Sequence, residues 1–387
     1  MPDDLPTAKR VVKEPTVSKA PPAGRKFPCP SCGARLDFDP SARGLSCPYC
    51  GYHQQIAKLA DAEVAERDYE QYLFREEANG KQVEGRSTQT RCGGCGAVVL
   101  LEDKVATDRC PFCNTHLENK PEAAEKMIPP EGVMPFAVDL RKARDAFTGW
   151  LEGLWFAPTE LKKVVALGQF SGVYLPFWTY DAMTYTAYDG QRGDDYQDTQ
   201  YVTQQLADGT TRQVAQTVTR TDWTSVSGEV DHFFDDLLVC GSKSLPGDLI
   251  ADLGDWQLPK LEPFQPDYLS GFKTERYAVG LKDGFGVAKG MMEPTIHSLI
   301  CRDIGGNHQR VDRKRTTYSA VTFKHVLLPA WVAVYRYHDR TFQVLVNGRT
   351  GKVTGYRPWS ASKIVALVLL IAVIVAFIMV LVMYFKR

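Results

Sequence analysis

The longest hydrophobic run of the chain lies at its C-terminal end, where residues 364–385 contain no charged residue and no proline. At about 1.5 Å per residue, a helix over this run is roughly 33 Å long, enough to cross a bilayer core of about 30 Å. Lys363 and Trp359 precede the run, as basic and aromatic side chains do at membrane interfaces. The pattern predicts a transmembrane anchor over residues 361–387, with a buried core helix as the alternative.

Upstream of the anchor, hydrophobic and polar residues alternate with a period of two. Strands are expected over residues 170–188, ending in a turn at Asp189-Gly190. Strands are also expected over residues 201–205 and 211–239, on the two sides of a hairpin turn at Asp208-Gly209. The polar residues 191–198 predict a loop. Four later runs also predict strands: 317–328, 331–337, 341–346 and 352–356.

Helical periodicity accompanies these strands. One helix is expected over residues 139–154, whose apolar side chains recur at three- and four-residue steps. A short helix is expected over 245–253, and partly helical structure over 275–302, with Pro294 breaking or kinking it. The pattern predicts a β-rich α+β central domain over residues 136–360.

The N-terminal third is organised by cysteines, which occur as two copies of one unit with an offset of 63 residues. Each copy has two CxxC pairs separated by fourteen residues, which is the spacing of a four-thiolate zinc site. The predicted ligands are Cys29, Cys32, Cys47 and Cys50 in the first copy, and Cys92, Cys95, Cys110 and Cys113 in the second. The sequence therefore predicts two structural Zn²⁺ sites in two small β zinc ribbons.

Residues 54–78 lack Gly and Pro and are rich in Ala, Glu and Gln, which predicts a helix between the ribbons. The expected fold is multidomain: two β zinc ribbons joined by a helix, the α+β domain, and one transmembrane helix. In chain order the parts ahead of the central domain are a disordered arm (1–24), ribbon 1 (25–53), a helical spacer (54–85), ribbon 2 (86–118) and a linker (119–135).

Other roles for the cysteines are disulfide formation and CxxC redox chemistry. Residues 1–26 contain no apolar leader, so a reducing compartment is expected, and paired cysteines there favour metal binding. His53 and His116 could each replace a cysteine ligand, but both sites are complete without them. Cys240 and Cys301 stand alone in apolar surroundings and are expected to be inert buried thiols.

Charge narrows the function classes. Lys and Arg together number 46, as do Asp and Glu, and this neutral balance disfavours a dedicated nucleic-acid binder. Enzyme signatures are sparse, because the chain lacks a G-x-x-x-x-G-K-[ST] loop. Three weaker groups are expected to be structural: Asp231, His232, Asp235 and Asp236 as exposed loop charges; Gly284, Gly286 and Gly290 as a closely packed or flexible segment; and Arg310, Arg313, Lys314 and Arg315 as a solvated loop or a contact to anionic lipid.

Three segments, GVYLPFWTYDA (172–182), LLPAWV (327–332) and VNGRTGKVTGYRPWSASK (346–363), together with the CxxC pairs, resemble a family of bacterial membrane proteins with N-terminal zinc ribbons. Members of that family are often encoded near SPFH-type membrane scaffolds and phage-shock-like proteins. The resemblance implies protein partners of that kind in an envelope-associated assembly. The present chain departs from many members in having two ribbons and a single span.

These observations predict a non-catalytic, membrane-anchored adaptor whose ribbons are binding modules on the cytoplasmic face of the cell membrane. A membrane-tethered nucleic-acid-binding protein is the alternative. The orientation follows from the missing leader and from four basic residues ahead of the span against two after it. If the ribbons are separate modules, replacing Cys29 and Cys32 with serine should unfold ribbon 1 and leave the central domain intact.

Overall fold

A computed structural model describes residues 27–57, 64–79, 83–84, 89–100, 107–118, 124–125, 127–156, 158, 169–205, 211–337 and 340–385. The first elements are β1 (Asp37–Asp39), β2 (Gly44–Ser46), β3 (His53–Gln55), β4 (Arg67–Asp68), α1 (Tyr69–Asn79), β5 (Val83–Glu84), β6 (Gln89–Arg91), β7 (Val98–Leu100), β8 (Thr107–Arg109), β9 (His116–Glu118) and β10 (Ala124–Glu125). They are followed by β11 (Gly132–Val133), α2 (Leu140–Glu152), β12 (Gln169–Gln205), β13 (Thr211–Cys240), α4 (Gly247–Leu253), η1 (Leu258–Lys260), β14 (Glu262–Pro263), η2 (Pro266–Leu269), β15 (Lys273–Glu275), α5 (Leu281–Ile304), β16 (His308–Tyr337), β17 (Arg340–Asn347), β18 (Val353–Gly355) and α6 (Ala361–Phe385).

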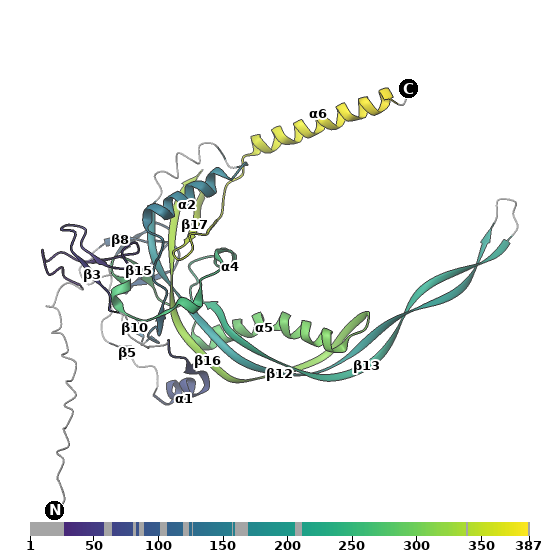
Figure 1. The fold of residues 1–387 in the computed structure, drawn as a ribbon, viewed down its shortest axis with the longest axis horizontal. Coiled ribbons are helices and arrows are strands. Elements are labelled where there is room, and N and C mark those ends of the chain that lie inside the picture. The colour runs from purple at the N-terminus through teal and green to yellow at the C-terminus, as the bar shows by residue number, and fades with distance from the viewer. Residues whose placement is uncertain are drawn as a thin grey trace, which may run out of the picture.

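Three long strands organise the molecule. β12 is antiparallel to both of its long neighbours, β13 and β16. Its pairing with β16 runs from Gln169↔Val334 to Gly193↔His308, and its pairing with β13 continues to Gln205↔Thr211. Figure 1 shows these strands leaving the main sheet and the elements packed around it, which we call the body. They form a long curved extension, which we call the arm (residues 183–205, 211–233 and 308–319).

The hydrophobic pattern of β12 explains how it is covered. Residues 173–182 are buried on both faces, as expected for a continuous apolar run in mid-sheet. From residue 184 to 190 buried and exposed positions alternate, because α5 covers one face of the arm (Figure 1). The Tyr188 hydroxyl donates a hydrogen bond to Asp303 of α5 (2.6 Å). Beyond Gly193 the pairing with β16 ends, so the distal arm is a two-stranded ribbon of β12 and β13. Most residues of β12 in this part are exposed.

The base of the arm contains an irregularity shared by all three strands. The register of both ladders shifts around Asp181, and the facing residues Asp236 and Ala320 have φ values of +47° and +48°. β-Bulges add a residue to one strand and increase its local twist and bend. The bulges therefore lie where the strands curve out of the body (Figure 1).

The sequence predictions for this region need two corrections. The turn at Asp189-Gly190 and the loop over 191–198 are wrong, because β12 continues through both. Gly190 instead allows a close approach, since a Cβ there would lie 2.3 Å from the carbonyl oxygen of Arg310. The basic run from Arg310 is likewise part of β16, not a loop. The Asp208-Gly209 turn and the arm over 1–24 lie outside the described residues.

The helix predicted over 54–78 is also wrong at residues 54–57 and 64–68, which are not helical, while residues 58–63 lie outside the described residues. Residues 53–55 form β3, which pairs with β2 and completes the sheet of ribbon 1. The helix there is α1, which begins at Tyr69, after Asp68 accepts a hydrogen bond from the Gln71 amide (2.7 Å). Tyr69 is buried against Phe285 and Phe323, so α1 packs on the central region.

The other predicted helices agree more closely with the structure. α2 and α4 match the expected spans, and Asp139 caps α2 by accepting the Lys142 amide (2.9 Å). Pro294 does not break α5, which continues from Leu281 to Ile304. Within the described residues, α6 is the one helix long and apolar enough to cross a membrane.

Candidate metal centres

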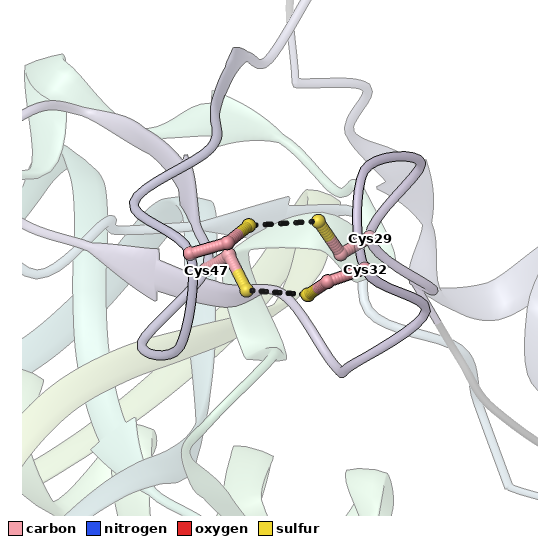
Figure 2. Close-up of side chains that lie close together, drawn as sticks. Cys29, Cys32 and Cys47 are labelled. Carbon is pink, nitrogen blue, oxygen red and sulfur yellow. Dashed lines mark hydrogen bonds between the residues drawn. The ribbon is translucent and has the colours of Figure 1, made fainter.

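The first four predicted cysteines converge on one point. The Cys29 and Cys50 sulfurs lie 3.5 Å apart, as do those of Cys32 and Cys47 (Figure 2). All four Sγ atoms lie within 4.8 Å of one another. Four sulfurs held about 2.3 Å from one ion are separated by roughly 3.8 Å, whereas a disulfide requires about 2.05 Å. The geometry therefore fits a four-thiolate metal site.

The second cluster repeats this arrangement. Cys92 and Cys113 are separated by 3.4 Å and Cys95 and Cys110 by 3.6 Å between their Sγ atoms. These four sulfurs also lie within 4.8 Å of one another. The structure thus brings all eight predicted residues together in two groups that could each hold a metal ion.

The backbone builds the same loop around every CxxC pair. The first cysteine accepts a hydrogen bond from the amide four residues later, and its own amide donates to the carbonyl five residues later. This loop requires positive φ at the residue after the second cysteine. Those residues are Gly33 (φ +72°), Gly51 (+74°), Gly96 (+77°) and Asn114 (+62°). The sequence carried this signal as Cys-Gly and Cys-Asn steps, which the cysteine spacing alone does not reveal.

Within each cluster the loops favour the thiolate form at one cysteine. Backbone amides of Cys50 and Tyr49 point at Cys47 and lower the pKa of its thiol to about 7. At Cys92, burial acts in the opposite direction, but the amides of Cys95 and Gly94 bring the thiol pKa to about 7. Two other thiols respond differently: the Ala34 amide lowers the pKa of Cys32, but hydrogen bonds with Cys47 and Cys50 raise it to about 12, and the hydrogen bond with Cys95 raises the pKa of Cys110. One thiol of each cluster is therefore favoured as the thiolate near neutral pH.

Ribbon 1 is built into the body rather than displayed beside it. Phe38 of β1 packs edge-to-face on Tyr268 (5.3 Å between ring centroids), and its amide donates to the Ser270 carbonyl (2.9 Å). Leu36 and Leu45 belong to the same core cluster as Trp331 and Phe136 of the central region. The hydrophobic residues between the two CxxC pairs therefore contribute to the core of the protein.

Ribbon 2 joins the main sheet directly. Val99 of β7 pairs with Glu275 of β15, and β15 pairs with β12. Phe112 is fully buried in the second core cluster, and its carbonyl accepts a hydrogen bond from the side chain of Gln343 in β17. A cleft of about 360 Å³ runs beside this ribbon, lined by Asp108, Arg109, Cys110, Pro111, Asn114, Arg144, Phe170, Ser171, Lys273 and Val334.

The remaining candidate residues lie apart from the clusters or form other contacts. The His53 ring bonds the Leu45 carbonyl through Nδ1 (3.0 Å), a structural contact within ribbon 1. His116 lies in β9, where it pairs with Arg109. Burial raises the pKa of the Cys240 thiol to about 12, which agrees with an inert cysteine. Cys301 lies 3.5 Å from the Nε2 atom of His297 on α5.

The acidic group around Asp231 is placed differently from the prediction, because it belongs to β13 rather than to a loop. Asp235 and Asp236 lie beside Asp181 at the base of the arm. Asp236 forms an ion pair with the buried Lys324 (2.7 Å) and its amide donates to Asp181 (2.6 Å). Lys324 also contacts Glu66 (3.1 Å), so a cation already balances this cluster.

Comparison with known proteins gives limited context. No family model matches the chain, and no solved structure matches it. The chain is 25% identical over 347 residues to the "Uncharacterized protein YdjG" of Bacillus subtilis (strain 168). The similarity covers 88% of this chain and 92% of that protein. The likeness therefore extends over most of both chains.

Proposed function

We propose that this protein is a non-catalytic, membrane-anchored adaptor. Two zinc ions staple the ribbons into the body, α6 holds the body at the membrane, and the arm binds protein partners. The observation that carries the proposal is the arm itself, whose distal part projects beyond the sheet. The paired-cysteine geometry supports zinc, which binds closed four-thiolate sites with tetrahedral geometry.

The distal arm offers unpaired backbone on both sides. β16 ends its pairing at Gly193, and among the described residues β13 pairs with β12 alone. Both strands of the distal ribbon therefore have free edges, which native proteins normally shield. A two-stranded ribbon is only marginally stable in water, so an added strand from another protein would stabilise it.

The side chains of the distal arm fit a protein partner better than a nucleic acid. Tyr196 and Tyr201 are exposed and suit contacts with a protein surface. Acidic residues such as Asp198 on β12 face basic ones such as Arg220 on β13, with 2.9 Å between the charged atoms. This mixed charge does not form the basic stripe that a phosphate backbone requires.

The anchor and the thiols support the proposed location. Two clusters of reduced cysteines are maintained most readily in a reducing compartment, which favours placement of the body on the cytoplasmic side of the cell membrane. The family resemblance suggests SPFH-type or phage-shock-type membrane proteins as partners. Metal analysis of the purified chain should give two zinc ions per chain.

The proposal is tested by shortening the arm. Replacing residues 196–220 with Asn-Gly, which favours a two-residue hairpin turn, removes the distal two-stranded part of the arm. It keeps Asp195 and Thr221 paired, with their side chains 2.7 Å apart. Affinity purification from solubilised membranes should recover partner proteins with the full chain and lose them with the short arm. Both proteins should keep two metal ions and their membrane location.

A matched control is Tyr49→Ala, which alters an exposed side chain of ribbon 1. This variant should retain the partners. If the short arm retains them and Tyr49→Ala loses them, the ribbons bind the partner and the arm proposal fails. Salt-sensitive binding of DNA or RNA by the full chain would support the nucleic-acid alternative instead.

A further inference from the structure

The described residues that follow α2 (153–156), which we call the loop after α2, are fastened to the start of α6, although the two are far apart in sequence. The Ser360 amide donates a hydrogen bond to the Phe156 carbonyl (2.8 Å), and the rings of Phe156 and Trp359 lie 6.2 Å apart. Ser360 begins the helix, because its carbonyl accepts the Ile364 amide (3.1 Å). The loop is therefore held at the point where the anchor starts.

Tyr356, which lies ahead of α6, is also held to the body by two hydrogen bonds. The Tyr356 hydroxyl donates to Asp248 of α4 (2.7 Å), and its carbonyl accepts the Tyr335 hydroxyl (3.1 Å). Contacts at Tyr356 and at Ser360 thus bracket Trp359. The start of the anchor and the loop after α2 form one surface of the body.

That surface presents two tryptophans to the outside. Trp155 is 84% exposed and Trp359 is 59% exposed. The apolar face of α2 already packs inward through Phe147 and Leu151, so Trp155 lies outside that core contact. Arg357 stacks on the Trp359 ring at 4.6 Å from its centroid. An indole with an adjacent guanidinium matches the boundary of a bilayer, where apolar rings meet anionic headgroups.

The depth of this surface follows from the length of the anchor. The uncharged run begins at Ile364, four residues after Ser360, which is about 6 Å along a helix. The headgroup layer on each side of the hydrocarbon core is about 5–7 Å thick. Trp359 and the loop hydrogen-bonded to Ser360 therefore lie at headgroup depth when α6 spans a bilayer.

We propose that Trp155 inserts, together with Trp359, into the phospholipid headgroup layer where α6 enters the membrane. The body then has two contacts with the bilayer, one through α6 and one through the loop after α2. A single helix leaves the body free to rotate about its axis. A second contact to one side of that axis restricts the rotation and fixes the direction in which the arm points.

The test uses the full chain reconstituted into vesicles of phosphatidylethanolamine and phosphatidylglycerol. A photoreactive benzoylphenylalanine replaces Trp155 in one variant, Val373 of α6 in a second and Tyr49 of ribbon 1 in a third. Tyr49 is 82% exposed, which matches Trp155, but it belongs to ribbon 1, and Figure 1 shows β3 of that ribbon apart from α6. After irradiation, mass spectrometry identifies phospholipid adducts on each protein.

We expect lipid adducts at positions 155 and 373 and none at position 49. Adducts at 373 without any at 155 would overturn the proposal while leaving the anchor in place. Crosslinks from 155 to protein would overturn it as well. Loss of adducts at both positions would refute the membrane contact and the anchor together, whereas the partner test on the arm would still stand by itself.

Discussion

If ribbon 1 were a separable module, unfolding it would leave the central region intact. Its packing against the central core predicts the opposite result. Replacing Cys29 and Cys32 with serine removes two of four ligands, and a small ribbon depends on its metal to fold. When ribbon 1 unfolds, the side chains it packs into the central core become exposed. The central region should therefore lose stability along with the ribbon.

The size of the loss can be estimated from three side chains. Leu36, Phe38 and Leu45 are almost fully buried in the cluster that also contains Trp331. Burial of such side chains contributes about 1.5–3 kcal/mol each, or roughly 5–9 kcal/mol together as an upper estimate. A whole domain is commonly stable by only about 5–15 kcal/mol. Even the lower value corresponds to a fall in Tm of roughly 10–20 °C for a domain of this size.

Tryptophan fluorescence provides the measurement, because all seven tryptophans lie at or after Trp150 and none is in a ribbon. Thermal unfolding of the purified double variant should show the lowered Tm, with metal content falling from two ions to one. Tyr49→Ala is the control and should keep the Tm of the natural sequence. A variant that loses one ion and keeps its Tm would refute the inference that ribbon 1 supports the core.

Two further predictions concern α5 and the buried Glu275. Gly284→Ala should destabilise the protein, because the added Cβ would lie 2.5 Å from the Tyr180 hydroxyl. At Gly286 the added Cβ meets no atom within 4 Å, so Gly286→Ala should stabilise the protein by up to about 1 kcal/mol through helix propensity. Thermal unfolding of the two variants measures both effects, and equal destabilisation by both would contradict the packing argument. Burial raises the pKa of Glu275 to about 7, so the folded chain holds a proton that the unfolded chain releases between about pH 4.5 and 7, and stability falls as pH rises through that range. Glu275→Gln should therefore stabilise the protein at pH 8 by up to about 3 kcal/mol and have little effect at pH 4. Denaturant unfolding at the two pH values measures the difference, and an equal effect at both would contradict the raised pKa of Glu275.

The metal clusters and the anchor could be predicted from sequence because their signals are local. Two CxxC pairs must fold back on one ion whatever surrounds them, and a 22-residue uncharged run needs no tertiary context to be recognised. The positive-φ residues after each pair, such as Gly33 and Asn114, are equally local. They become informative once the loop geometry is known.

The arm could be predicted only in part. The strand expected over residues 211–239 agrees with β13, but the part of β12 that projects into solvent lacks the alternation that identifies strands. Residues 191–198 are polar at almost every position, which is typical of a loop, yet they pair with β13 throughout. Gly190 resembles a turn residue but serves a close contact between neighbouring strands. Residues 53–55 suit a helix but complete the sheet of ribbon 1, since tertiary pairing outweighs weak propensity.

Residues 64–79 contact the base of the arm. Glu66 forms an ion pair with Lys324 (3.1 Å), and Tyr69 packs on Phe323 of the same strand. Lys324 also pairs with Asp236, the bulge residue of β13, at 2.7 Å. Lys324 is buried, so an unpaired partner would leave an uncompensated charge in the core, which is strongly destabilising. The bend at the base of the arm therefore depends on residues 64–79 staying in place.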